Sequence, residues 1–166
     1  MTIDCSVISP IGLNSLNPGL KVECEVVDCF FNLLEACFSI QRLSCRTATY
    51  LIRLFQTDIT EALKNQLLEQ IQYESVYVEY LPGKYGIDWN STTGHLIIPL
   101  PYAEHYTCGV VNFATQSVSY FNSKGGNGAY NFWVEKLRWY LNYYLPWSVS
   151  SIANITAGLS SKDLNL

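Results

Sequence analysis

The chain has 166 residues, 49% of them hydrophobic and 14% aromatic, which excludes an intrinsically disordered protein and is enough for one buried core. Its net charge of -4 and its 10 Lys and Arg residues exclude a basic surface for nucleic acid, and no apolar run is long enough to span a membrane. We therefore expect a single domain over residues 1–166, with neither nucleic acid nor a membrane as a partner.

The first segment, residues 1–19, is rich in proline, glycine and asparagine, which favour turns. This composition predicts an irregular N-terminal arm. The opening residues MTIDCSVISP do not show a basic region followed by an apolar core, which is the pattern of a secretory signal. We expect a cytoplasmic or nuclear protein.

Helices are predicted for most of the first half of the chain. In ECEVVDCFFNLLEACFSIQRL, hydrophobic residues recur at spacings of three and four, which is typical of an amphipathic helix over residues 26–38. Similar patterns predict two more helices, over residues 46–55 and 59–72.

The hydrophobic period changes near Tyr73. ESVYVEYL alternates, HLIIPL is a short apolar run, and YTCGVVNF and SVSYFN flank a turn. These segments predict a central, mainly antiparallel sheet over residues 76–122, against which the helix of residues 26–38 packs. AYNFWVEKLRWYLNYYL then predicts a C-terminal helix that ends before Pro146, followed by a weakly structured tail over residues 148–166. The order of elements predicts an α+β fold.

The cysteines lie in apolar segments and do not have the CxxC spacing of a zinc site. In a chain that can bury a core, this favours reduced, mostly buried thiols. His95 is interpreted as a surface or strand-edge residue, because no third metal ligand stands at a suitable spacing. We expect no metal and no cofactor. The six cysteines are Cys5, Cys24, Cys29, Cys37, Cys45 and Cys108.

The pair of predicted strands before and after the turn places two polar residues at one end of the sheet. His105 begins the first strand and Asn122 ends the second, so a tight turn brings the two side chains together. An Asn carbonyl oxygen that holds Nδ1–H of the imidazole leaves Nε2 to take a proton from a nucleophile. The alternative is a strand-edge histidine and a turn asparagine without a functional role.

The segment HLIIPLPYAEHYTCGVVNFATQSVSYFNSKGG resembles the core of the ubiquitin-like-protein proteases, the SUMO-specific cysteine peptidases, and of their relative the adenovirus endopeptidase. Ile98-Pro99, His105-Tyr106 and the run Tyr120-Phe121-Asn122-Ser123 match successive elements of that family. LNPGLKVECEVVDCFFNLL is similar to its opening helix, and FWVEKLRWYL to the helix after its catalytic acid. The resemblance implies a papain-like cysteine protease fold of the SUMO-protease type over residues 20–147.

The same resemblance implies that His105 is a general base and that Asn122 takes the place of the acid that orients it. The family has Asp or Glu at that place, has Trp where this chain has Tyr106, and has a Gln followed by an Asp-Cys-Gly nucleophile farther along. No cysteine follows Cys108 in this sequence.

Three explanations are open: an inactive relative, a truncated or split domain, or a nucleophile from Cys24 or Cys29 near the start of the first helix. We expect a catalytically impaired or inactive relative that binds a protein partner, with a ubiquitin-like protein as the candidate. The alternative is an active thiol peptidase or isopeptidase that cleaves a ubiquitin-like protein or a viral-type polyprotein, with His105 as the base. The predicted partner surface is the aromatic face of the C-terminal helix opposite Leu137 and Leu141.

Overall fold

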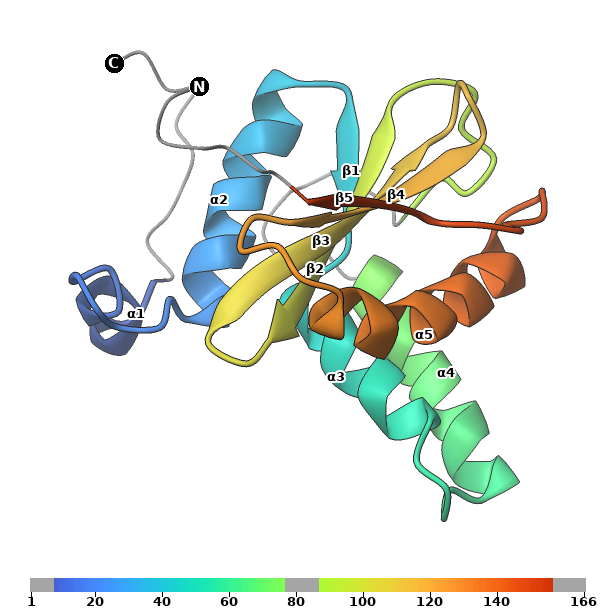
Figure 1. Ribbon diagram of the computed structural model, residues 1–166, viewed down its shortest axis with the longest axis horizontal. Coiled ribbons are helices and arrows are strands. Elements are labelled where there is room, and N and C mark those ends of the chain that lie inside the picture. Colours follow the sequence, from blue (N-terminus) through green and yellow to red (C-terminus); the bar gives the residue numbers. More distant parts are fainter. Residues whose placement is uncertain (1–7, 77–86, 157–166) are drawn as a thin grey trace.

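The computed structural model describes residues 8–76 and 87–156, which form helices packed around one mixed sheet (Figure 1). The helices are α1 (Pro10–Asn14), α2 (Cys24–Cys37), α3 (Cys45–Leu54), α4 (Glu61–Val76) and α5 (Gly128–Tyr144). The strands are β1 (Ile40–Arg42), β2 (His95–Tyr102), β3 (His105–Asn112), β4 (Ser117–Asn122) and β5 (Ala153–Thr156). The predicted α+β class is confirmed.

The sheet has five strands in the order β1-β2-β3-β4-β5. The two central pairings, β2 with β3 and β3 with β4, are antiparallel, as the alternating pattern predicts. The outer strands add in parallel: β1 pairs with β2 and β5 pairs with β4. The core of the sheet is therefore a meander built from one continuous segment, residues 95–122, with a short parallel strand on each edge.

The side chains of strand β3 alternate between the two faces of the sheet. Thr107, Gly109 and Val111 are buried and face α5, since a Cβ on Gly109 would lie 2.8 Å from Cδ2 of Leu137. Glycine at this position lets α5 approach the strand closely. The alternate residues of β3, including Tyr106, point to the face on which α2 lies. Figure 1 shows α3, α4 and α5 gathered on one side of the sheet, with α2 on the other.

The core lies between the sheet and α3, α4 and α5. Trp133 is fully buried, and its Nε1–H donates to the Pro101 carbonyl at 3.2 Å. Tyr120 donates to Thr107 Oγ1 at 2.7 Å, and Thr107 donates in turn to the Leu100 carbonyl at 2.7 Å. These bonds satisfy polar groups that would otherwise be costly to bury. The leucine and isoleucine side chains with no exposed surface are Leu43, Leu51, Ile71, Leu96, Ile98, Leu100, Leu137 and Leu141.

Three predicted boundaries differ from the structure. The N-terminal arm contains α1, a single turn of helix in which Ser9 Oγ accepts a hydrogen bond from the Gly12 N–H at 3.1 Å. The predicted tail contains β5, which has no buried residue and hence no alternation to mark it. The predicted strand ESVYVEYL is wrong at its start, because α4 continues through Val76, and its remainder lies outside the described residues.

The expectation of buried cysteines is wrong for Cys24 and Cys37, which are exposed at the two ends of α2. The spacing of apolar residues predicts the helix but does not show whether another element covers its two ends. Cys45 is buried as predicted, Cys108 is partly buried, and Cys5 lies outside the described residues.

In the part of the chain that the structure describes, no helix is both long and apolar enough to cross a membrane.

Candidate functional site

Asn122 is held in one orientation by the turn that follows β4. Its side chain is only 2% exposed, and Nδ2–H donates to the Gly125 carbonyl at 2.8 Å. Its Oδ1 accepts the N–H of Lys124 at 3.1 Å. Gly125 and Gly126 have φ angles of 72° and 76°, a left-handed backbone that glycine adopts without strain. These two backbone contacts therefore fix which end of the amide is the oxygen and which is the nitrogen.

The amide oxygen of Asn122 faces the ring of His105. The distance from His105 Nε2 to Asn122 Oδ1 is 3.1 Å, so the predicted contact between the two side chains is confirmed. Because an oxygen stands at Nε2, that nitrogen must carry the hydrogen, and Nδ1 is the acceptor of the neutral ring. The prediction had the two nitrogens the other way round, since the rotation of the ring is not encoded in the spacing of the two residues.

Aromatic side chains form the wall beside the imidazole. His105 pairs with Tyr102 across the β2–β3 turn, and their rings meet edge to face with centroids 6.1 Å apart. The Tyr102 ring also contacts Phe132 of α5, at a centroid distance of 5.7 Å. The histidine is partly buried on the α5 face of the sheet. Sequence reasoning missed Tyr102, although its place opposite His105 in a two-residue hairpin was a usable signal.

The described thiols do not meet the imidazole. Cys24 Sγ lies 3.0 Å from the hydroxyl of Tyr106, which is next to His105 on β3 and therefore points to the opposite face of the sheet. Cys108 points to that opposite face too, and burial raises the pKa of its thiol to about 11. Within residues 8–76 and 87–156, no thiol hydrogen-bonds to the His105 ring. The arrangement does not support Cys24 as a partner of His105.

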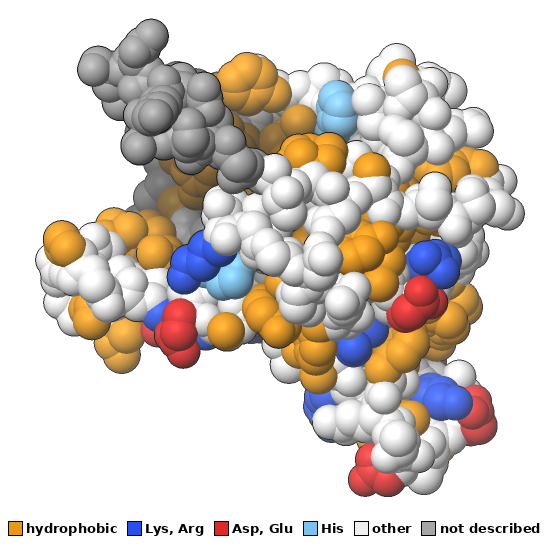
Figure 2. Space-filling model, viewed as in Figure 1, with side chains coloured by type: hydrophobic (Ala, Val, Ile, Leu, Met, Phe, Trp, Pro, Cys, Tyr) orange, Lys and Arg blue, Asp and Glu red, His pale blue; other side chains and the backbone are white. Residues whose placement is uncertain are grey.

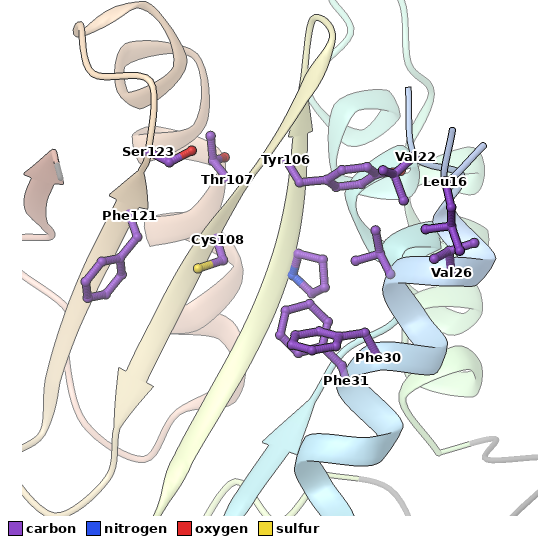
Figure 3. A pocket seen from close by; sticks show the side chains of 12 residues that line it. Leu16, Val22, Val26, Phe30, Phe31, Tyr106, Thr107, Cys108, Phe121 and Ser123 are labelled. Carbon is purple, nitrogen blue, oxygen red and sulfur yellow. The ribbon is translucent and has the colours of Figure 1, made fainter. Parts of the chain in front are cut away.

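An apolar pocket of about 460 Å³ lies on that opposite face, between α2 and the strands. Figure 3 shows Phe30 and Phe31 of α2 directed toward the strands, with Tyr106, Cys108 and Phe121 on the strand side. The rest of the lining comes from Leu16, Val22, Val26, Val27, Pro99, Thr107 and Ser123. Its size and lining are those of a site for apolar groups.

The outer face of α5 carries a row of exposed aromatic rings, which we call the aromatic stripe: Phe132, Trp139 and Tyr143, with Phe55 from the end of α3. Trp139 is 41% and Tyr143 59% exposed, and their rings stack with centroids 5.9 Å apart. Phe55 meets Trp139 edge to face at 5.7 Å. The Lys136 ammonium lies 4.0 Å from the centroid of Phe132. The predicted exposed face opposite Leu137 and Leu141 is thus present, whereas Trp133 and Tyr140 belong to the core.

Comparison with known proteins gives a match in structure but not in sequence. No protein-family model and no curated protein matches the chain. Its structure is similar to the C-terminal Ulp1 protease domain solved in complex with Smt3, the yeast ortholog of SUMO, with a TM-score of 0.59, 11% identity, and coverage of 88% of this chain and 60% of that one. The chain has a Ulp1 protease-like fold.

Two further solved structures agree. SUMO protease Ulp1 with its catalytic cysteine oxidised to a sulfenic acid matches with a TM-score of 0.58 and 11% identity over 87% of this chain and 60% of that chain. A de-sumoylating protease matches with a TM-score of 0.53 and 11% identity, covering 89% of this chain and 57% of the other. The chain therefore spans about 60% of the length of these proteases, and at this identity the likeness concerns the fold.

Proposed function

We propose that this chain is a catalytically impaired or inactive relative of the SUMO proteases that serves as a protein-binding module, with a ubiquitin-like protein as its partner. The observation that carries the proposal is the His105–Asn122 pair, which has the arrangement of a base and its orienting group but has no thiol bonded to the ring among the described residues. We also propose that residues 1–166 form a single domain.

The chemistry of Asn122 supports an impaired site. A carboxylate beside a histidine stabilises the imidazolium that forms when the ring takes a proton from a nucleophile. The amide of Asn122 accepts the Nε2–H hydrogen bond but has no charge to offer. The pair holds the ring in place and selects its tautomer, and it gives little help to proton transfer.

The aromatic stripe is the proposed contact surface for the partner. Trp and Tyr supply large apolar area with few rotatable bonds, and they are enriched among the residues that dominate binding energy. Trp139 and Tyr143 are stacked on each other, so little side-chain freedom remains to be lost on binding. Support for a ubiquitin-like partner comes from the structural neighbour solved in complex with Smt3.

One observation favours a second function, that of a thiol peptidase or isopeptidase. The Asn122 oxygen directs Nε2–H inward and leaves Nδ1 of His105 able to accept a proton. A nucleophile supplied from outside the described residues, or by another chain, would complete a Cys-His-Asn site for a ubiquitin-like or viral-type polyprotein substrate. The role of His105 as general base belongs to this alternative.

Two measurements on purified protein distinguish the two functions. SUMO and ubiquitin are titrated by calorimetry against the wild type and against Trp139→Ala, Tyr143→Ala and the matched non-stripe variant His105→Ala. We expect binding that each stripe variant weakens roughly 30-fold, which corresponds to about 2 kcal/mol for a residue that dominates an interface, and that His105→Ala leaves unchanged.

The second measurement uses SUMO and ubiquitin that carry a thiol-reactive group at the C-terminus. No covalent adduct is expected for the binding module. An adduct with the wild type that His105→Ala abolishes would establish the peptidase instead. Absence of binding to either protein would refute the proposed partner.

A further inference from the structure

Two cysteines that are far apart in the sequence meet at the N-terminal ends of two helices. Cys24 is the first residue of α2 and Cys45 is the first residue of α3. Asp28 Oδ1 accepts the backbone N–H of Cys45 at 3.0 Å, and Cys24 lies one turn before Asp28 on the same side of α2, so the two thiols are neighbours. The effect of the Cys24 thiol on the pKa of Cys45 agrees with this placement. Cys24 in turn contacts the Tyr106 hydroxyl at 3.0 Å. The four groups form one cluster between α2, α3 and β3.

The two thiols differ in their access to solvent. Cys24 is exposed, whereas Cys45 is only 1% exposed. Burial first, and then the neighbouring Asp28 carboxylate and the Cys24 thiol, raise the pKa of Cys45 well above its ordinary value. An oxidant from solvent therefore reaches Cys24 first, because Cys45 is shielded from solvent.

We propose that Cys24 and Cys45 form a reversible disulfide when the protein meets a hydroperoxide, so that α2 and α3 become covalently linked at their N-terminal ends. The proposal is independent of the proposed binding function, because neither cysteine contacts the aromatic stripe or His105. It assigns a modification site to residues other than His105, Asn122 and the aromatic stripe.

The chemistry balances in two steps. The Cys24 sulfur attacks one oxygen of the hydroperoxide, so an S–O bond forms and the O–O bond breaks; Cys24 becomes a sulfenic acid and the second oxygen leaves as water or an alcohol. The Cys45 sulfur then attacks the Cys24 sulfur, forming the S–S bond and breaking the S–O bond. The Cys45 proton passes to the Asp28 carboxylate and then to the departing hydroxide, giving water. The two thiols lose two electrons in total and the peroxide gains them.

The disulfide would also change the apolar pocket. Tyr106 lines that pocket and is held by Cys24. When Cys24 turns to Cys45, the hydroxyl of Tyr106 loses its partner and the ring is free to move. Oxidation of Cys24 and Cys45 would in this way alter the shape of the apolar pocket between α2 and the sheet.

The test is peptide mapping of the full chain after treatment with hydrogen peroxide and alkylation of the remaining thiols under denaturing conditions. Trypsin together with a glutamate-specific protease separates Cys24, Cys29, Cys37 and Cys45 onto different peptides. We expect the dipeptide Cys24-Glu25 joined to Leu43–Arg46, with loss of two hydrogens from the intact protein and recovery of both thiols on reduction.

Matched variants control for chance oxidation. Cys24→Ser keeps a hydroxyl for Tyr106 and should leave Cys45 fully open to alkylation after unfolding. Cys37 is an exposed thiol at the other end of α2, and Cys37→Ser should form the same Cys24–Cys45 link as the wild type. Oxidation of wild-type Cys24 to a sulfinic acid without the link, or a link to a different cysteine, would overturn the proposal. Because the mapping is done on the wild type, a variant that folds poorly does not affect this outcome.

Discussion

Asn122 should matter more for stability than His105 does, although the two form a pair. The Asn122 side chain is 2% exposed and makes three hydrogen bonds: its Oδ1 accepts from His105 Nε2–H and from Lys124 N–H, each at 3.1 Å, and its Nδ2–H donates to the Gly125 carbonyl at 2.8 Å. At about 1 kcal/mol for each bond, Asn122→Ala should lower the free energy of unfolding by about 3 kcal/mol. His105→Ala removes one of these bonds and should cost about 1 kcal/mol.

Urea unfolding followed by tryptophan fluorescence measures both changes. Asn122→Asp is a matched control, because it keeps an oxygen for His105 and Lys124 and loses the donor to the Gly125 carbonyl. Its cost should fall between those of the two alanine variants. Equal costs for Asn122→Ala and His105→Ala would refute the reasoning, since they would mean that the turn does not depend on the Asn122 side chain.

Three more predictions follow from other parts of the structure. Gly109→Ala should lower the free energy of unfolding by about 1–3 kcal/mol, because its Cβ would lie 2.8 Å from Leu137 in the core; an unchanged urea midpoint would contradict this. Burial raises the pKa of Cys108 from 9.0 to about 11, so at pH 8 iodoacetamide should alkylate it roughly 100-fold more slowly in the folded than in the urea-unfolded protein, and equal rates would exclude this burial. Burial also raises the pKa of Asp28 in spite of the nearby Arg42 guanidinium, so folding favours the protonated acid. The contribution of Asp28 to the free energy of unfolding has its full value below pH 3.8 and decreases as the pH rises through the pKa of Asp28 in the folded protein. Urea titrations over this range should show the wild type losing stability relative to Asp28→Asn.

The central strands could be predicted because their two sides face different surroundings. In β3, Thr107, Gly109 and Val111 are buried while their neighbours are only partly so, which gives the alternation that marks a strand. The α2 and α5 helices were equally evident, because each has a continuous apolar side. Strong contrast between faces is what a sequence pattern records.

The edge strands lacked that contrast. β1 has three residues and β5 has four, all of β5 exposed, so their pairing depends on a neighbouring strand that is distant in the sequence. The start of ESVYVEYL alternates and was predicted as a strand, yet α4 extends through Val76. A short alternating run does not outweigh the helical pattern of the residues that precede it.

At the candidate site, the proximity of His105 and Asn122 followed from the topology of a tight hairpin. The identity of the contacting nitrogen did not follow, because it depends on how the ring is rotated and on which end of the amide the turn holds. The proximity of Cys24 and Cys45 did not follow from the sequence either, because it depends on how α2 and α3 are placed relative to each other, which no local pattern describes.

The arrangement of the sheet has a consequence for how the chain folds. The meander β2–β3–β4 pairs neighbouring segments through tight turns, so its closure costs little chain entropy. β1 instead joins Ile40 to His95, 55 positions along, and β5 joins Ser119 to Ala153, 34 positions along. Long loops must close before these parallel pairings form, and such contacts slow folding. We therefore expect the antiparallel meander to form first and the two outer strands to join the sheet later, one on each side of it.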